Sequence, residues 1–150
     1  MGLVANRSLE ADRMNDIFSK IVRGELPCHK VAENDQTLAF LDINPAAQGH
    51  TLVIPKRFGT DIFDTNPEDL VAVARMVQTV AQLLLQTLKP DGINVLQNSR
   101  PASGQVVFYY HVHVIPRWEG DGVFSFWRPN PTDHAAFAAL AERLRANNQA

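Results

Sequence analysis

Apolar residues recur at helical spacing in one long segment of the chain. Between Pro67 and Leu88 they return every three or four positions, which predicts an amphipathic helix with one face packed on a sheet. Asn66 can cap this helix, and its first residue is a proline, which suits a first helical position. The same spacing predicts a short helix over Asp16–Arg23 and a final helix that starts near Asp133.

Short apolar runs bounded by turn residues predict five strands. They are Lys30–Glu33, Thr37–Asp42, His50–Pro55, Ile93–Gln97 and Val106–Pro116. The connections between the first three are too short for parallel crossovers, so an antiparallel meander is expected. The predicted fold class is therefore α+β: a mainly antiparallel sheet with one long helix and one or two shorter helices packed on it.

Length and composition narrow the class of protein. The chain has 150 residues, of which 45% are hydrophobic and 20% charged, as expected for one globular domain. We expect residues 1–14 to be a poorly ordered leader and residues 15–150 to form the domain and a helical tail. The net charge of -2 argues against a nucleic-acid partner or an anionic membrane surface. We expect no apolar run to approach the roughly 20 residues that a membrane span requires.

The single cysteine, Cys28, excludes an internal disulfide and a cysteine-rich zinc site. A reducing, cytoplasmic location is therefore expected.

Two histidines lie two residues apart in the last predicted strand. In a regular strand alternate side chains share a face. One face would then carry Gln105, Val107, Tyr109, His111 and His113, and the other face Phe108, Tyr110, Val112 and Val114. Two imidazoles beside a phenol, backed by an apolar face, indicate a functional site on a rigid sheet.

Two kinds of chemistry fit this pair of histidines. They can supply two metal ligands, with His50 as a third. Alternatively, one is a nucleophile or general base, and the other orients it or donates a proton. The loop upstream offers neutral donors and a glycine, namely Asn98, Ser99, Ser103, Gly104 and Gln105. Since no acidic residue falls between Asp91 and Glu119, this loop favours phosphate oxygens over a metal.

The sequence around these histidines resembles a known family. Residues 104–117, GQVVFYYHVHVIPR, resemble the signature of the histidine triad (HIT) family, in which three histidines alternate with hydrophobic residues after a Gly-Gln pair. Residues 16–27, 38–43 and 49–56 resemble its opening segment and two central strands. The likeness runs from about residue 16 to 118. It is greatest to the branch of Hint-type nucleoside phosphoramidate hydrolases and bacterial HIT proteins.

The resemblance implies a role for each matched residue. His111 would be the nucleophile, with His113 as charge stabiliser or proton donor, and His50 and Gln105 in support. Tyr109 stands where the family has its first histidine, and Val106 where members often have a serine or threonine that holds phosphate. Asp42 would bind the ribose, Asn98 the phosphate, and Gly104 would allow close backbone approach. The base would be enclosed by Phe18, Ile21, Phe40 and Ile43.

The leading hypothesis is a hydrolase or transferase. It would cleave a purine nucleoside phosphate from a phosphoramidate, a dinucleoside polyphosphate or a related compound through a nucleotidyl-histidine. No cofactor is expected, and Ser19 together with the lone cysteine implies that the zinc site of some bacterial members is absent. The alternatives are a nucleotide-binding module with little turnover, because Tyr109 and Val106 remove two polar groups, and a metal-dependent hydrolase.

Further expectations concern assembly and strand register. The resemblance implies a homodimer, and Val71, Leu83 and Leu85 fall off the main apolar stripe of the long helix, which leaves surface for a partner. If Tyr109 lies beside His111, Tyr109→His should keep or raise turnover. Phe108 and Tyr110 should then lie buried on the opposite face.

Overall fold

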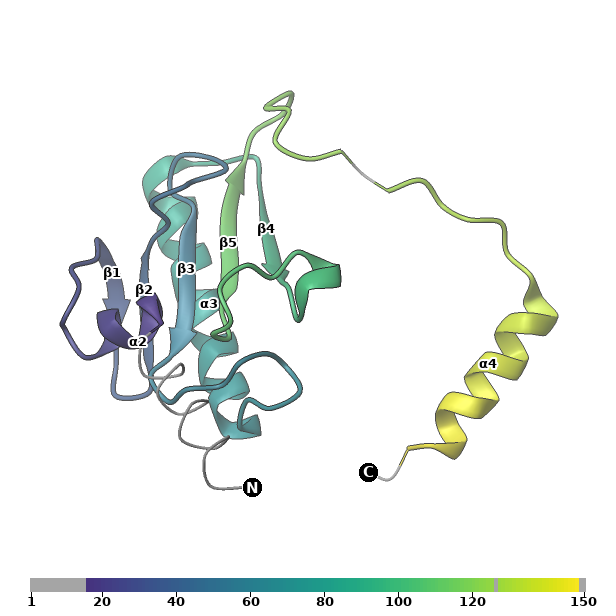
Figure 1. Ribbon diagram of the computed structural model, residues 1–150. Helices are drawn as coiled ribbons and strands as arrows, with labels where there is room; N and C mark the ends of the chain where they lie inside the picture. The colour runs from purple at the N-terminus through teal and green to yellow at the C-terminus, as the bar shows by residue number, and fades with distance from the viewer. Residues whose placement is uncertain (1–15, 126, 149–150) are drawn as a thin grey trace, which may run out of the picture.

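The structure is a computed structural model that describes residues 16–125 and 127–148, so the predicted leader lies outside the described residues. Its strands are β1 (Lys30–Glu33), β2 (Thr37–Leu41), β3 (Thr51–Pro55), β4 (Gly92–Gln97) and β5 (Val112–Arg117). They form one antiparallel sheet in the order β1-β2-β3-β5-β4. Its helices are α2 (Ile17–Val22), α3 (Pro67–Leu88), α4 (His134–Ala146) and the 3-10 turn η1 (Pro101–Ser103). The predicted α+β fold class is confirmed (Figure 1).

The long helix α3 covers one face of the sheet. Asn66 caps its start by accepting a hydrogen bond from the N–H of Glu68 at 2.9 Å. Its buried stripe packs on the apolar side chains of that face, and together they comprise Val73, Met76, Val80, Leu84, Ala39, Val53, Tyr110, Val112 and Val114. Apolar burial against the sheet, more than helix propensity, holds α3 in place.

By length and composition alone, α3 could also cross a membrane, contrary to the expectation that no apolar run has that length. Core helices pass the same test. Because Val73 and Val80 are fully buried within the fold, the packing of α3 is that of a core helix.

The opposite face of the sheet carries a second apolar cluster, which includes the short helix α2. Its buried members are Phe18, Leu38, Phe40, Leu52, Ile54 and Tyr109. Asp16 caps α2 by accepting hydrogen bonds from the N–H groups of Phe18 and Ser19. Since six residues are too few to form a stable helix alone, α2 depends on this cap and on Phe18, which packs edge-on against Phe40.

The last strand begins later than predicted. β5 starts at Val112, and residues 105–111 form an irregular segment that is held by distant backbone groups, including Gly59 O, which accepts from Tyr110 N–H at 2.7 Å. The predicted alternation holds at Tyr109 and Tyr110, which lie in opposite clusters. It fails at Phe108, which is 49% exposed, because this segment lacks the pleat of a strand.

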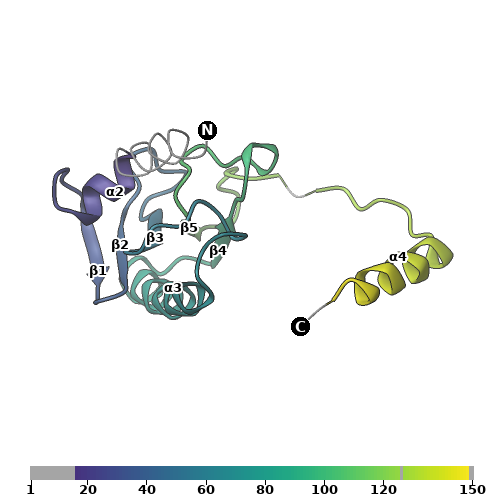
Figure 2. The same ribbon diagram turned by 60° about the horizontal axis from the view of Figure 1, so that its bottom comes forward.

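The predicted final helix is present as α4, capped by Asp133, which accepts from the N–H of Ala136. It lies well away from the sheet at the end of an extended arm, on the side of β4 (Figures 1 and 2).

Candidate active site

A cavity of about 590 Å³ opens on the face of the sheet opposite α3. Its walls come from α2, from strands β2 to β5 and from the loop before β5. His50, His111 and His113 lie in it, together with Asp42 and Asn98. All four side chains predicted to enclose a base also line it: Phe18, Ile21, Phe40 and Ile43. Residues far apart in the sequence thus meet in one apolar pocket that carries a few polar groups, as ligand sites commonly do.

The tautomer of His111 follows from one hydrogen bond. Its Nδ1 lies 2.6 Å from the carbonyl oxygen of Tyr109, which can only accept, so Nδ1 carries the proton. Burial lowers the pKa of His111, which keeps the ring neutral near pH 7. Nε2 of His111 therefore holds a lone pair. A neutral imidazole with its lone pair free is a competent nucleophile.

The tautomers of His50 and His113 are fixed in the same way, starting from a backbone amide. The N–H of Ala46 donates to Nδ1 of His50 at 3.0 Å, so the proton of a neutral His50 is on Nε2. That Nε2–H in turn donates to Nδ1 of His113 at 2.8 Å, which leaves the His113 proton on Nε2. The His113 ring centroid is 4.9 Å from that of His111. A lone pair on one ring and an N–H donor on the other thus stand side by side.

Burial is the main reason that the pKa values of His50, His111 and His113 are lowered. Burial, followed by the neighbouring His111 and His50, lowers the pKa of His113 to about 4, and burial also lowers the pKa of His50. All three rings are thus neutral near pH 7.

This shift predicts a stability change with pH. Between about pH 6.5 and 4 the unfolded chain protonates His113 and the folded chain does not. The contribution of this residue to the free energy of unfolding is therefore fully present above pH 6.5 and is lost as the pH is lowered toward 4. The loss is about 3 kcal/mol at pH 4 from this residue. Urea unfolding from pH 7 to 4 measures it. His113→Gln should flatten the profile, and an unchanged profile in that variant would contradict the assignment.

Polar groups in the cavity remain available to a ligand. The Oδ1 of Asp42 accepts from the N–H of Asn44 at 2.8 Å, and its Oδ2 lies 3.6 Å from Nε2 of His50. The side chain of Asn98 makes no hydrogen bond to the described residues. Nor do the backbone N–H groups of Val106 and Val107, which also line the cavity. Two backbone amides and an Asn side chain on the wall of one cavity suit the oxygens of a phosphate.

Gln105, which the resemblance places in support of the nucleophile, does not line the cavity. Its side-chain amide donates to the carbonyls of Thr60 at 2.7 Å and Val107 at 3.2 Å, and its Oε1 accepts from the N–H of Arg100 at 2.6 Å. Gln105 therefore shapes the loop that Gly104 begins. Gly104 has φ +95°, a backbone conformation that favours glycine.

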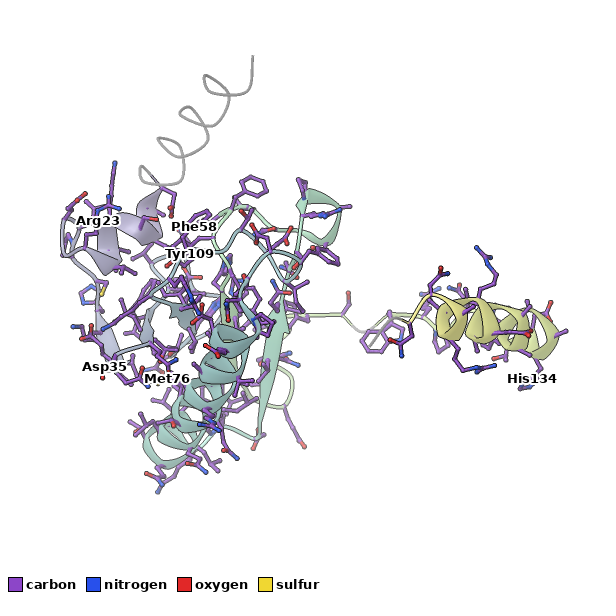
Figure 3. All side chains as sticks on the ribbon, turned by 90° about the horizontal axis from the view of Figure 1, so that it is seen from below. Arg23, Asp35, Phe58, Met76, Tyr109 and His134 are labelled. Carbon is purple, nitrogen blue, oxygen red and sulfur yellow. The ribbon has the colours of Figure 1, made fainter. Side chains whose placement is uncertain are left out.

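Tyr109 is also placed differently from the prediction. It lies on the His111 side of the sheet, but its ring packs against Phe58 with centroids 5.2 Å apart, and its hydroxyl donates to the carbonyl of Pro55 at 2.6 Å. Figure 3 shows Tyr109 beside Phe58, on the side of the sheet opposite Met76 of α3. The ring does not line the cavity. The expectation that it stands beside the nucleophile is thus wrong, and its contact with His111 is made by the backbone carbonyl.

The sequence reasoning missed several groups. Ile17, Leu26, Pro27, Cys28 and Leu41 extend the apolar end of the cavity, and Leu96 and Phe124 line it as well. Their spacing gave no signal that separates a pocket wall from ordinary core. The N–H of Ala46 and the carbonyl of Tyr109 could not be predicted from residue type, because every residue has a backbone carbonyl and every residue except proline has a backbone N–H.

Arg100 adopts a strained backbone conformation at the edge of this loop. Its φ of 72° and ψ of 160° fall in a region that is essentially limited to glycine, and Pro101 follows it. Hydrogen bonds at both of its backbone groups hold it there: its N–H donates to Gln105 Oε1, and its carbonyl accepts from Ser103 N–H at 3.1 Å.

A matched pair of variants measures this strain. Arg100→Gly and Arg100→Ala both lose the contacts of the guanidinium with Phe63 and Asp61. Only glycine adopts the φ and ψ of this position without backbone strain. Since relief of about 1–3 kcal/mol exceeds the entropy cost of glycine, about 0.5–1 kcal/mol, Arg100→Gly should be the more stable variant by roughly 1 kcal/mol. Urea unfolding of the pair measures the difference. Equal stabilities would mean that the loop relaxes.

Asp42, His50 and His113 could also be read as cation ligands, since their ligand atoms lie within 4.8 Å of one another. However, the nitrogens of His50 and His113 are 2.8 Å apart, closer than the roughly 3.3 Å between two ligands on one tetrahedral zinc. The arrangement fits a hydrogen bond better than shared coordination.

Comparison with known proteins gives consistent matches over most of the chain. The family model described as HIT domain matches residues 23–120. Protein hit of Bacillus subtilis is 39% identical over 121 residues, which are 80% of this chain and 83% of that protein. The adenosine 5'-monophosphoramidase hnt1 of Schizosaccharomyces pombe is 36% identical over 132 residues, 87% of this chain and 96% of that protein. The crystal structure of a HIT family protein from Bacillus anthracis superposes with a TM-score of 0.84 at 34% identity, covering 90% of this chain and 98% of that chain.

Proposed function

The chain belongs to the HIT family, and from this premise we propose that it hydrolyses a purine nucleoside phosphoramidate through a nucleotidyl-histidine intermediate. One observation carries the proposal: the Tyr109 carbonyl holds the Nδ1 proton of His111 and so directs a lone pair from Nε2. The monophosphoramidase of Schizosaccharomyces pombe supports a hydrolase, and its name supplies the class of substrate.

The nucleotide would lie along the length of the cavity. The base fits the apolar end between Phe18, Ile21 and Phe40, and the ribose hydroxyls can donate to Asp42. The α-phosphate is then next to the histidines, where Asn98 and the free amides of Val106 and Val107 can donate to its oxygens. Because these amides belong to the backbone, the side chain of Val106 is not needed for this contact.

The reaction would proceed in two displacements. The Nε2 lone pair of His111 attacks phosphorus and the bond to the leaving nitrogen breaks. The leaving nitrogen takes a proton from water, and the Nε2–H of His113 donates a hydrogen bond that stabilises the charge developing there. The hydroxide that remains attacks phosphorus, the bond to His111 breaks and returns the neutral ring, and the nucleoside monophosphate leaves. Positioning and charge stabilisation carry most of the acceleration in such transfers.

The charge of the cavity favours an amine over a polyphosphate as the leaving group. None of the described residues that line it is lysine or arginine, and Leu96, Val106 and Phe124 are apolar. A polyphosphate would lack charge-assisted contacts worth about 1.5–3 kcal/mol each. We therefore expect kcat/KM for an adenosine phosphoramidate to exceed that for a dinucleoside polyphosphate by about tenfold or more. The opposite preference in steady-state assays would contradict this part of the proposal.

Turnover of an adenosine phosphoramidate, with and without a chelator, tests the function. Turnover that the chelator leaves unchanged is expected. Binding of AMP without turnover would identify a nucleotide-binding module, and loss of turnover with the chelator would identify a metal-dependent hydrolase.

A further inference from the structure

One end of the cavity is left without a role when the nucleotide is in place. Leu96, Ile115 and Phe124 line the cavity, but the base, the ribose and the phosphate are assigned to other residues. In the sheet order β1-β2-β3-β5-β4, these three residues lie on β5, on β4 and just after β5, on the far side of the sheet from the base. Leu96 is the cross-strand partner of His113. This end of the cavity therefore begins beside the imidazole that faces the leaving nitrogen.

The direction of the displacement leads to the same end. In phosphoryl transfer the attacking and leaving atoms stand roughly in line, on opposite sides of phosphorus. The ring of His111 lies next to Phe18 of α2, with the two ring centroids 5.3 Å apart. The leaving nitrogen then lies on the side away from α2, which is the side of β4. Any group that this nitrogen carries would meet Leu96, Ile115 and Phe124.

The surface at this end of the cavity is apolar. Leu96 is 40% and Phe124 43% exposed, whereas Ile115 is buried beneath them in the sheet. The guanidinium of Arg117 contacts the Phe124 ring, but it is already engaged, because its Nε and Nη2 donate to Asp121 and its Nη1 donates to Asn94. A charged group placed here would lose water without gaining a partner, whereas an apolar group would bury apolar surface.

The side chain of Phe124 is held in position by the turn that precedes it. The Cζ of Arg117 lies 5.0 Å from the centre of the Phe124 ring. Asp121 fixes this arginine and also accepts hydrogen bonds from the N–H groups of Trp118 and Val123, each at 3.0 Å. Because these contacts restrain the ring beforehand, a ligand that packs on Phe124 has little ordering entropy to lose.

From these observations we propose that Leu96, Ile115 and Phe124 form a subsite for the substituent of the leaving amine. The preferred leaving group is a primary amine that carries an aryl group. Phe124 determines this specificity, and Asp121 is a positioning residue that acts through Arg117. The inference rests on the proposed function, since it takes the substrate to be a nucleoside phosphoramidate.

Turnover of three adenosine phosphoramidates gives the first test. Their leaving amines are propylamine, 3-phenylpropylamine and β-alanine, which are similar in basicity, so the chemical step is closely matched. We expect kcat/KM for the phenylpropyl compound to exceed that for the propyl compound by about fivefold or more, the value of an aromatic contact. The β-alanine compound should be the poorest substrate because of its carboxylate. Equal values for the propyl and phenylpropyl compounds, or a preference for the carboxylate, would overturn the proposal.

Variants assign the preference to particular residues. Phe124→Ala should abolish it, with kcat/KM for the propyl compound within about twofold of the parent value. Phe63→Ala is the matched control, since Phe63 is 70% exposed and does not line the cavity, and it should keep the preference. An equal loss in both variants would overturn the role of Phe124. Asp121→Ala should weaken the preference, and an unchanged preference would overturn its positioning role.

Binding to the His111→Ala protein separates the subsite from the reaction. This variant lacks the nucleophile, so the phosphoramidates stay intact during calorimetry. The phenylpropyl compound should bind about fivefold more tightly than the propyl compound, and adding Phe124→Ala should remove the difference. That result would support the subsite even if the parent protein cleaved none of the compounds, which would refute the proposed function alone. Equal dissociation constants would overturn the subsite even if the parent protein cleaved all three.

Discussion

Replacing His111 with alanine is expected to lower kcat by about 10⁴- to 10⁶-fold, the usual cost of removing a nucleophile. The loss follows from geometry: no other described imidazole has its tautomer set by a carbonyl that leaves Nε2 as the acceptor. His113 carries its proton on Nε2 and so presents a donor. Acid quenching during turnover, followed by mass spectrometry, should detect the nucleotidyl adduct in the parent protein and not in His111→Ala.

Two further variants sharpen this result. His113→Ala should slow adduct formation by about 10²–10³-fold, the range for losing one preorganised hydrogen-bond donor, without moving the adduct from His111. His29 is exposed and lies outside the cavity, so His29→Ala should retain parental activity. An adduct on any other residue, or full activity in His111→Ala, would contradict the assignment.

Replacing Tyr109 with alanine should destabilise the fold by about 3–5 kcal/mol, the usual cost of truncating a buried aromatic residue. Tyr109 is 1% exposed and packs between Phe18 and Phe58. Phe108→Ala, at a neighbouring position that is 49% exposed, is the matched control and should cost far less. Urea unfolding of both variants measures the difference, and similar losses would mean that the placement of this segment is wrong.

The same residue separates stability from catalysis. Tyr109→Phe removes the hydrogen bond to the Pro55 carbonyl and should cost about 1–2 kcal/mol of stability. Its kcat should change little, because the carbonyl that holds His111 belongs to the backbone. Tyr109→His would place a smaller polar ring in an apolar cluster. The sequence predicts that Tyr109→His keeps or raises turnover, and the position of the ring outside the cavity gives no reason for a rise.

Side-chain periodicity predicted the parts of the fold that depend on it. The stripe of α3, the antiparallel meander of β1 to β3 and the common cavity of His111 and His113 all follow from spacing and turns. Tyr109 and Tyr110 also point to opposite faces, as alternation requires. The tertiary contacts of residues 105–111 could not be predicted this way, since Gln105 bonds to Thr60, which is 45 residues away.

In the candidate site, too, some groups could be predicted from the sequence and others could not. The side chains that meet in the cavity could be named from a family signature, whereas the groups that set the tautomers are main-chain atoms. For Gln105 and Tyr109, the residue type suggested a role in catalysis. In the structure their side chains donate hydrogen bonds to backbone carbonyls and so hold the surrounding loops in place.

The chain of hydrogen bonds from Ala46 through His50 to His113 has a consequence for how such a site can diverge. The acid or base character of His113 is set at a loop position whose own side chain takes no part in it. A change that removed that single N–H, such as a proline at position 46, would free Nδ1 of His50 to hold the proton. His50 would then present a lone pair toward His113, which would have to reverse its own tautomer. Its Nε2 would change from donor to acceptor with every histidine still in place. Two relatives with identical histidines can therefore differ in whether this ring donates or accepts a hydrogen bond at the reacting group, through an alteration in the loop alone.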